Sequence, residues 1–174
     1  NLSTSGSGAK TLTLSGSGAG EFSGAIGNSA GGNTALTQSG TGTWTLSGAN
    51  TYTGATTVSS GFLIVDGNQS AATGALTVAG GATLGGSGTI GGATTISGIH
   101  SPGTSPGVQT FTSGLTYSTS STFLWELTGN TNSGRGTAFD GVNVSGGTLT
   151  INAGVINNLV FNGSGSTVNW SDAF

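Results

Sequence analysis

Side chains able to catalyse a reaction or hold a metal are scarce in this chain. Its 174 residues include one histidine, two basic residues, five carboxylates and no cysteine. The carboxylates are spread along the sequence, at Glu21, Asp66, Glu126, Asp140 and Asp172. Cleavage of a polysaccharide needs two converging carboxylates, or an acidic cluster with a cation and a base. The spacing indicates no such pair, so we expect no catalytic site and no metal site.

The single histidine, His100, stands in the stretch "SGIHSPGTSPG". A Ser-His-Asp triad needs its serine on a strand-to-helix elbow, and helix-forming residues are too few here for helices of any length. We therefore interpret His100 as a loop imidazole beside two turns, Ser101–Pro102 and Ser105–Pro106. The two prolines are expected at a bulge or corner. Asp140 and Arg135 are close enough in sequence to form an ion pair across a turn.

Three glycine-rich stretches look like cofactor or cation motifs but lack the context that such sites need. "GSGTIG" (86–91) satisfies G-x-G-x-x-G, yet the strand-like "GATTIS" follows it where a dinucleotide site needs a helix. "GSGAKT" (6–11) has Ala9 where a phosphate loop has glycine. "GGSGTI" (85–90) lacks the aspartate of a calcium-binding roll. We expect no cofactor.

The charge content excludes several classes of partner. The formal net charge is −3, and only Lys10 and Arg135 are basic. Two cations cannot neutralise a row of phosphates, so nucleic-acid binding is not expected. No apolar run approaches the ~20 residues of a membrane-spanning helix, so we expect no membrane insertion. The absence of cysteine and methionine suggests an extracellular protein.

The elements that position these residues are predicted to be short strands. Glycine is abundant, with 36 residues, and the β-branched and aromatic residues between the glycines alternate with polar ones. The expected strands are Thr11–Leu14, Thr43–Leu46, Thr56–Val58, Phe62–Val65, Leu76–Val78, Thr94–Ile96, Thr122–Leu127, Val142–Val144, Thr148–Ile151, Leu159–Phe161 and Thr167–Trp170. Within Thr122–Leu127 the alternation puts Phe123, Trp125 and Leu127 on one face and Glu126 in solvent.

A six-residue period predicts how the strands are arranged. Val78, Leu84, Ile90 and Ile96 are evenly spaced, with paired glycines between them. One aliphatic residue per six suits one face of a triangular coil, with roughly 18–20 residues per turn. We therefore predict an all-β fold, a right-handed parallel β-helix of about nine short turns without significant helix. Stacked turns place identical residues above one another, which favours columns of threonines and disfavours charged residues.

Internal repetition supports a single solenoid domain over 1–174. "KTLTLSGSGAGEFSGA" (10–25) aligns with "GTWTLSGANTYTGA" (42–55), which matches Leu14 to Leu46 and Leu12 to Trp44. The repeat is weaker in 1–40 and clearest in 41–107, and 108–174 forms the last turns. An antiparallel sandwich is the alternative fold, but it needs longer strands and more hairpin turns. Trp44 and Tyr52 are candidates for stacking on sugars, and the match of Trp44 to Leu12 favours a buried ring.

The units "TGTWTLSGANTYTGATTVSSGFLIVDG" (41–67) and "GATLGGSGTIGGATTISGIHSPGTSPG" (81–107) resemble the autotransporter-associated β-strand repeats of bacterial surface proteins. The segment "GTAFDGVNVSGGTLTINAG" (136–154) resembles the sequence that often follows these repeats. The resemblance implies a right-handed parallel β-helix that is exported to the cell surface. Family members serve mainly as stalks, passengers and adhesins, and no catalytic residues come with the resemblance.

The ends of the predicted coil suggest a function. Each end is an open strand edge, and neither terminal sequence carries a charge run or another cap. We therefore expect a structural subunit that stacks head to tail on copies of itself. The candidate assembly edges are Leu2, Leu12, Leu14, Val168, Trp170 and Phe174. The alternative is an adhesin or stalk that binds polysaccharide or a host surface along its length, and an enzyme is the weakest hypothesis.

Overall fold

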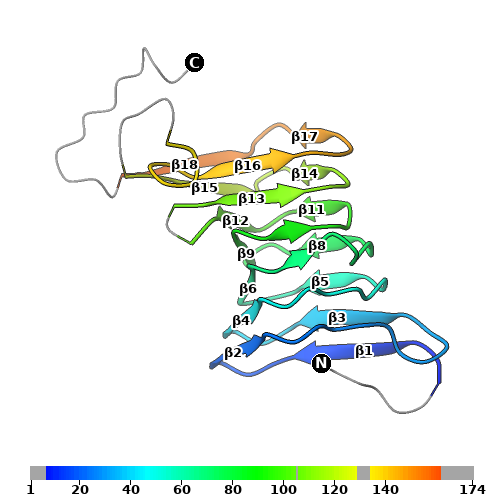
Figure 1. The fold of residues 1–174 in the computed structure, drawn as a ribbon. Coiled ribbons are helices and arrows are strands. Elements are labelled where there is room, and N and C mark those ends of the chain that lie inside the picture. Colours follow the sequence, from blue (N-terminus) through cyan, green and yellow to red (C-terminus); the bar gives the residue numbers. More distant parts are fainter. Residues whose placement is uncertain (1–6, 105, 129–133, 162–174) are drawn as a thin grey trace.

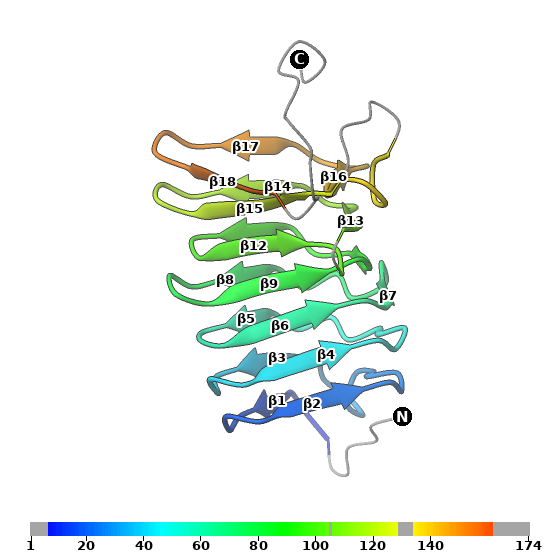
Figure 2. The ribbon, with the colours of Figure 1, turned by 90° about the vertical axis from the view of Figure 1, so that its left-hand side faces the viewer.

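The protein is a β-solenoid formed by three parallel sheets, as shown by a computed structural model (Figure 1). The structure describes residues 7–104, 106–128 and 134–161. The chain passes from one sheet to the next and returns to the first one rung higher, so that successive circuits pile up (Figures 1 and 2). All of the strand pairs that define the sheets are parallel, which confirms the expected parallel coil and rules out the antiparallel sandwich.

We number the three sheets I to III. Sheet I stacks seven strands in the order β1 (Lys10–Leu14), β3 (Thr34–Gln38), β5 (Thr56–Val58), β8 (Leu76–Val78), β11 (Thr94–Ile96), β14 (Leu115–Tyr117) and β17 (Leu149–Ile151). Sheet II stacks β2 (Ala19–Phe22), β4 (Thr43–Leu46), β6 (Phe62–Val65), β9 (Thr83–Gly86), β12 (Ile99–Pro102), β15 (Thr122–Leu127) and β18 (Ile156–Phe161). Sheet III stacks β7 (Asn68–Gln69), β10 (Thr89–Ile90), β13 (Val108–Phe111) and β16 (Gly141–Val144).

The six-residue period corresponds to one residue per sheet, as predicted. Val78 lies on β8 of sheet I, Leu84 on β9 of sheet II and Ile90 on β10 of sheet III. Ile96 then returns to sheet I on β11, where it pairs with Val78. All four side chains are buried, because each inward position meets the inward positions of the other two sheets. The aliphatic period therefore marks the hydrophobic core.

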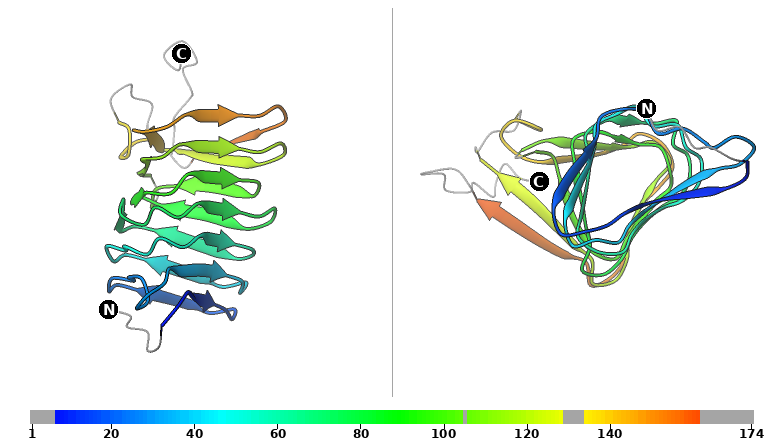
Figure 3. Two further views of the ribbon diagram at one scale, coloured as in Figure 1. Left: turned by 90° about the vertical axis from the view of Figure 1, so that its right-hand side faces the viewer. Right: turned by 90° about the horizontal axis from the view of Figure 1, so that it is seen from below.

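The expected number of turns was too high. The longest sheets hold seven strands, so the solenoid has fewer turns than the nine expected. The difference arises because several circuits are longer than 18–20 residues. Lys10 pairs with Thr34, 24 positions later, and Leu115 pairs with Leu149, 34 positions later. Seen along the axis, the first circuit reaches beyond the outline of those above it (Figure 3).

Of the eighteen strands among the described residues, ten were predicted, four of these with shifted ends, and the repeat alignment was wrong. The strands that were missed are β2, β3, β7, β9, β10, β12, β13 and β14. Six expected strands coincide with β4, β5, β6, β8, β11 and β15. The alignment matched Leu14 to Leu46, whereas Leu14 lies on sheet I opposite Gln38 and Leu46 lies on sheet II opposite Phe22. The two sheets carry similar motifs because both alternate threonine with an aliphatic residue. The expected strand Thr167–Trp170 lies outside the described residues.

Close stacking of circuits explains part of the glycine content. A Cβ atom at Gly88 would lie 2.3 Å from the carbonyl oxygen of Gly67 in the circuit below. A Cβ atom at Gly20 would lie 2.5 Å from Cζ3 of Trp44 in the circuit above. Real side chains do not approach so closely, so glycine is required where a backbone or a large ring covers the position.

Candidate functional site

His100 lies in the core and not in a loop, which corrects the sequence-based interpretation. It is on β12, it is fully buried, and it pairs with Leu84 of the circuit below. Its ring is in contact with the rings of Phe111, Tyr117 and Phe123. The two prolines are expected at a bulge or corner, and Pro102 is the last residue of β12.

Both imidazole nitrogens of His100 are hydrogen-bonded, and the partners fix the tautomer. The side-chain amide of Gln109 donates from Nε2 to the carbonyl of Gly85, at 2.8 Å. Gln109 Oε1 therefore faces His100 Nε2, at 2.8 Å, and accepts a hydrogen bond from the Nε2–H group. Nδ1 is then left unprotonated and accepts the Tyr117 hydroxyl, at 2.5 Å. The three side chains come from β12, β13 and β14, so the cluster links all three sheets.

Burial controls the ionisation of this cluster. Removal from water lowers the pKa of His100 to about 4, and the hydrogen bond with Gln109 opposes this only in part. Burial likewise raises the pKa of Tyr117 above its ordinary value. Both groups are thus neutral at physiological pH. His100 is fully buried and neutral, so we interpret the cluster as part of the packed interior.

Asp140 forms a second buried polar centre, with different partners from those expected. Its Oδ1 accepts the backbone N–H of Gly107 at 2.9 Å, and its Oδ2 accepts that of Glu126 at 2.8 Å. Its own carbonyl accepts the indole N–H of Trp125 at 2.6 Å. Arg135 instead donates to the carbonyl of Val142, so the expected ion pair with Asp140 is not among the described contacts. Burial raises the pKa of Asp140, and the two backbone hydrogen bonds oppose that rise.

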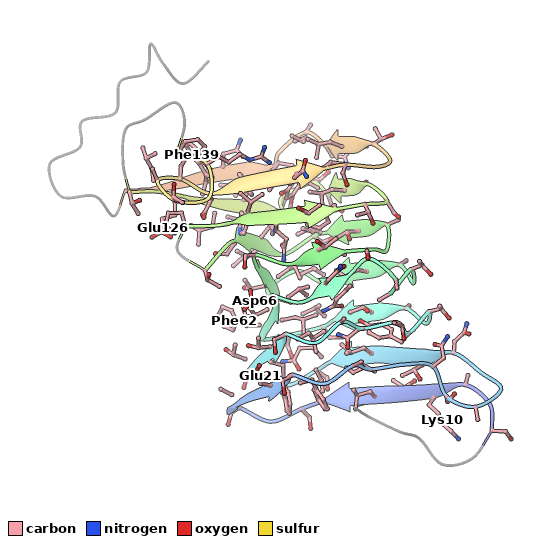
Figure 4. The ribbon with its side chains drawn as sticks, viewed as in Figure 1. Lys10, Glu21, Phe62, Asp66, Glu126 and Phe139 are labelled. Carbon is pink, nitrogen blue, oxygen red and sulfur yellow. The ribbon has the colours of Figure 1, made fainter. Side chains whose placement is uncertain are left out.

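The other carboxylates do not converge. Glu21, Asp66 and Glu126 lie at different heights along the side of the solenoid that carries sheet II (Figure 4). Glu126 is half-buried, although the alternation placed it in solvent. Within the described ranges, no three His, Cys, Asp or Glu side chains come together as a metal ion would require. The fifth carboxylate, Asp172, lies outside these ranges.

Sequence reasoning missed two G-x-S-x-G patterns, at 27–31 and 103–107, which a search for nucleophiles would select. Ser29 of the first pattern is buried, and its hydroxyl donates to the carbonyls of Gly8 and Gly32, at 2.5 and 3.0 Å. It lies between β2 and β3, several circuits below His100. Ser105 of the second pattern lies outside the described residues. The "GSGTIG" stretch forms parts of β9 and β10, with a strand and not a helix after it.

The aromatic residues that could stack on sugars face the interior. Tyr52 is buried and its hydroxyl lies 2.7 Å from the Thr56 hydroxyl. Trp44 is half-buried, stacks on Phe22 with ring centroids 5.6 Å apart, and packs against the core. Trp44 pairs with Gly20 and Leu63, and not with Leu12 as the alignment implied. Neither ring offers a free platform for a sugar.

The candidate assembly edges fall partly within the described residues. Leu12 and Leu14 lie on β1, the first strand of sheet I; Leu12 is half-buried and Leu14 is buried. Leu2, Val168, Trp170 and Phe174 lie outside the described residues. Sequence reasoning missed the residues at the other end of the stack. The exposed fraction there is 47% for Leu149, 61% for Ile151 and 56% for Ile156.

Leu149 and Ile151 border an apolar hollow in the last described circuits, whereas Ile156 lies in the outward column of sheet II. The hollow has a volume of about 180 Å³ and is lined by Tyr117, Phe123, Val142, Leu149, Ile151, Val155 and Asn157. Leu149 and Ile151 continue the inward columns of sheet I, since they pair with Leu115 and Tyr117 below them. Their parity along the strand, the signal used for the other core positions, could have identified them.

Comparison with known proteins identifies one repeat in the chain. Residues 36–65 match the passenger-associated-transport-repeat family. The matched segment begins in β3 and ends with β6, about one and a half circuits of the solenoid. No curated protein matches the chain. The part of the chain that the structure describes has no helix able to span a membrane. The chain thus carries an autotransporter-associated repeat on a parallel β-solenoid.

Proposed function

We propose that the protein is a structural, extracellular β-solenoid that assembles head to tail into a filament on or near a bacterial surface. The observation that carries the proposal is the pair of exposed aliphatic side chains, Leu149 and Ile151, that ends the inward columns of sheet I among the described residues. Exposed aliphatic residues in a continuous patch mark a surface that meets another apolar surface. The passenger-associated repeat supports the extracellular location.

The opposite end offers free backbone groups. β1 pairs only with β3, and β2 only with β4, within the described residues. Lys10 N donates to Asn33 O at 2.9 Å, and Leu14 O accepts from Ser39 N at 2.9 Å. In a parallel ladder, alternate residues point their N–H and C=O groups to opposite neighbours. The backbone groups of Thr11 and Thr13 therefore point away from β3, toward the position of a further strand.

The two ends fit each other because they are rungs of the same coil. The first rung consists of β1 and β2, and the last of β16, β17 and β18, so sheets I and II end on both sides, whereas sheet III begins only at β7. A second copy that places β1 over β17 continues the ladder of sheet I and covers the apolar hollow. Such a contact is heterologous, and it extends without closing. The filament would gain about 34 Å per copy, from seven strands at ~4.8 Å.

A proline at the free edge tests the backbone contact. Thr11→Pro removes an N–H that faces the open side and leaves the bonds of Lys10 and Leu14 to sheet I in place. We expect the variant to stay folded, while its assembly, measured by analytical ultracentrifugation, falls at least about tenfold. Thr11→Val is the matched control, because it keeps the N–H and the branched shape. Equal assembly of both variants would overturn the edge contact.

A charge at the apolar end tests the other half of the contact. Leu149→Asp places a carboxylate where the account requires burial, and it should abolish growth. Phe62 has nearly the same exposed fraction as Leu149, 46% against 47%, but lies on the outer face of β6. Phe62→Asp is therefore the control and should assemble normally. Loss of assembly in both variants would point to general destabilisation, which circular dichroism would reveal.

A passenger that binds a surface with its long side is the second candidate, and Phe62 favours it. Its ring is 46% exposed, and Ile99, two rungs higher in the same outward column of sheet II, is half-buried. An exposed aromatic ring on the side of the solenoid suits a polysaccharide. Binding of the chain to an insoluble polysaccharide such as cellulose, lost in Phe62→Ser, would favour this candidate if Leu149→Asp binds normally.

A further inference from the structure

The outer face of sheet I carries an unbroken column of threonines. Each member pairs in register with the next, through all seven strands of the sheet. The members are Thr13, Thr37, Thr57, Thr77, Thr95, Thr116 and Thr150. The residues before and after each of them point into the core, as Leu76 and Val78 do around Thr77. The column is therefore half-exposed or exposed along its whole length.

Small, uncharged residues flank the column on both sides. On one side lie Ala35, Ala55, Ala75 and Ala93. The carbonyls of the last three accept hydrogen bonds of 2.9–3.0 Å from backbone N–H groups of the strand below. On the other side lie Ser39, Ser59, Ala79, Ser97 and Ser118. We call these three columns the threonine face. None of its residues is charged, whereas Glu21 and Glu126 both lie on strands of sheet II.

We propose that the threonine face is the contact through which two copies of this chain pair side by side. Like residues repeat at the strand spacing of ~4.8 Å, and a second solenoid has the same spacing by construction. Two such faces interdigitate along their full height, as paired sheets with identical small side chains do. Little side-chain conformational entropy is lost when the two faces meet, because the branched side chain of threonine is stiff at χ1.

The area of the face suits a second copy better than a smaller ligand. Seven strands at ~4.8 Å and five residues at ~3.3 Å give roughly 550 Å² per copy, or about 1,100 Å² in total. A specific interface needs about 1,000 Å². The face also has no aromatic or arginine anchor of the kind that dominates contacts with unrelated proteins. A hollow of about 340 Å³ on this face lies beside Gly114 and Thr148 and offers a place for a side chain of the partner.

Symmetry predicts which residue meets its own copy. β8 is the middle strand of the seven in sheet I, so Thr77 is the central threonine. When two faces overlap fully about a two-fold axis, Thr77 of one copy meets Thr77 of the other, for parallel and antiparallel solenoids alike. The chain has no cysteine, so a single introduced thiol reports this contact alone.

The first test is disulfide formation by Thr77→Cys under mild oxidation, followed on non-reducing gels. We expect it at least about tenfold faster than by Ser87→Cys, whose residue is exposed beside sheet II. The second test is a pair of lysines, Thr57→Lys with Thr116→Lys. These should lower side-by-side association by at least about tenfold, because each lysine must lose its water. Thr45→Lys with Thr110→Lys is the control. All four threonines are half-buried, but Thr45 and Thr110 face outward on sheets II and III and not on sheet I.

The outcomes separate this contact from the end-to-end one. Thr11→Pro should stop growth in length and leave the Thr77→Cys disulfide intact, and the paired lysines should give filaments of single width. Equal rates for Thr77→Cys and Ser87→Cys would overturn the proposal. A monomer that shapes growing ice crystals, and loses this property with the Thr57 and Thr116 lysines, would also overturn it, because the occupant would then be crystalline water.

Discussion

The hydroxyl of Tyr117 donates a hydrogen bond of 2.5 Å to Nδ1 of His100 in the interior of the solenoid. The bond requires a neutral imidazole, because a protonated ring has no free acceptor. His100 takes the place that Leu84 occupies one rung below, so a polar cluster interrupts an apolar column. The cluster joins the three sheets and makes the stability of the core sensitive to acid.

Acid should therefore destabilise the protein through His100. Its pKa is about 4 when folded and 6.5 in the ordinary state, so between these values the unfolded chain binds a proton that the folded chain does not. The contribution of His100 to the free energy of unfolding is therefore complete above pH 6.5. It falls by roughly 3 kcal/mol as the pH drops toward 4. Urea unfolding at several pH values measures this.

The variant His100→Leu isolates this effect. It should be less stable at pH 7, since Tyr117 and Gln109 lose a partner, but it should lack the decline between pH 6.5 and 4. The pKa of Asp140 is raised, so its protonation stabilises both proteins as the pH falls. The difference in stability between the two proteins therefore reports His100. An unchanged decline in His100→Leu would contradict the assignment.

Gly20→Ala should destabilise the first circuits. The added Cβ would lie 2.5 Å from the Trp44 ring, which is held by Phe22 and the core. We expect a loss of about 1–3 kcal/mol in the free energy of unfolding. Gly18→Ala is the control, since a Cβ there meets nothing within 4 Å. Trp44→Leu should rescue Gly20→Ala in the double variant, because the smaller side chain leaves room.

Asp140→Asn should lower stability by about 1–3 kcal/mol, measured by chemical unfolding at pH 7. Each carboxylate oxygen of Asp140 accepts one backbone N–H, and an amide would turn a donor toward one of them. Asp66→Asn is the matched control. There a single oxygen accepts from both the N–H and the hydroxyl of Ser87, so the amide oxygen preserves both bonds.

Ile96→Ala should remove about 2–5 kcal/mol, because Ile96 is fully buried between Val78 and Tyr117. The neighbouring Thr95→Ala changes an exposed side chain on the same strand and should alter thermal stability only slightly. Comparable losses in the two variants would mean that the inward and outward faces of sheet I had been assigned wrongly.

The sequence predicted the coil where its repeat was regular. Val78, Leu84, Ile90 and Ile96 are equally spaced because that circuit has tight corners, so their period revealed three faces. Circuits with longer corners broke the period, which is why nine turns were expected. β12 and β13 were missed because prolines and glycines surround them, and His100 was therefore read as a loop residue. Burial of polar residues such as Gln109 and Asp140 depends on partners from other circuits, which no local pattern shows.

Electron microscopy of the purified 174-residue chain tests the central claim most directly. The account predicts filaments of constant width whose lengths increase in steps of about 34 Å, one solenoid at a time. Thr11→Pro should show no growth in length under the same conditions, only solenoids one copy long, single or paired side by side. Wild-type particles of one length at every concentration, with Leu149 and Ile151 covered within a single copy, would contradict the account.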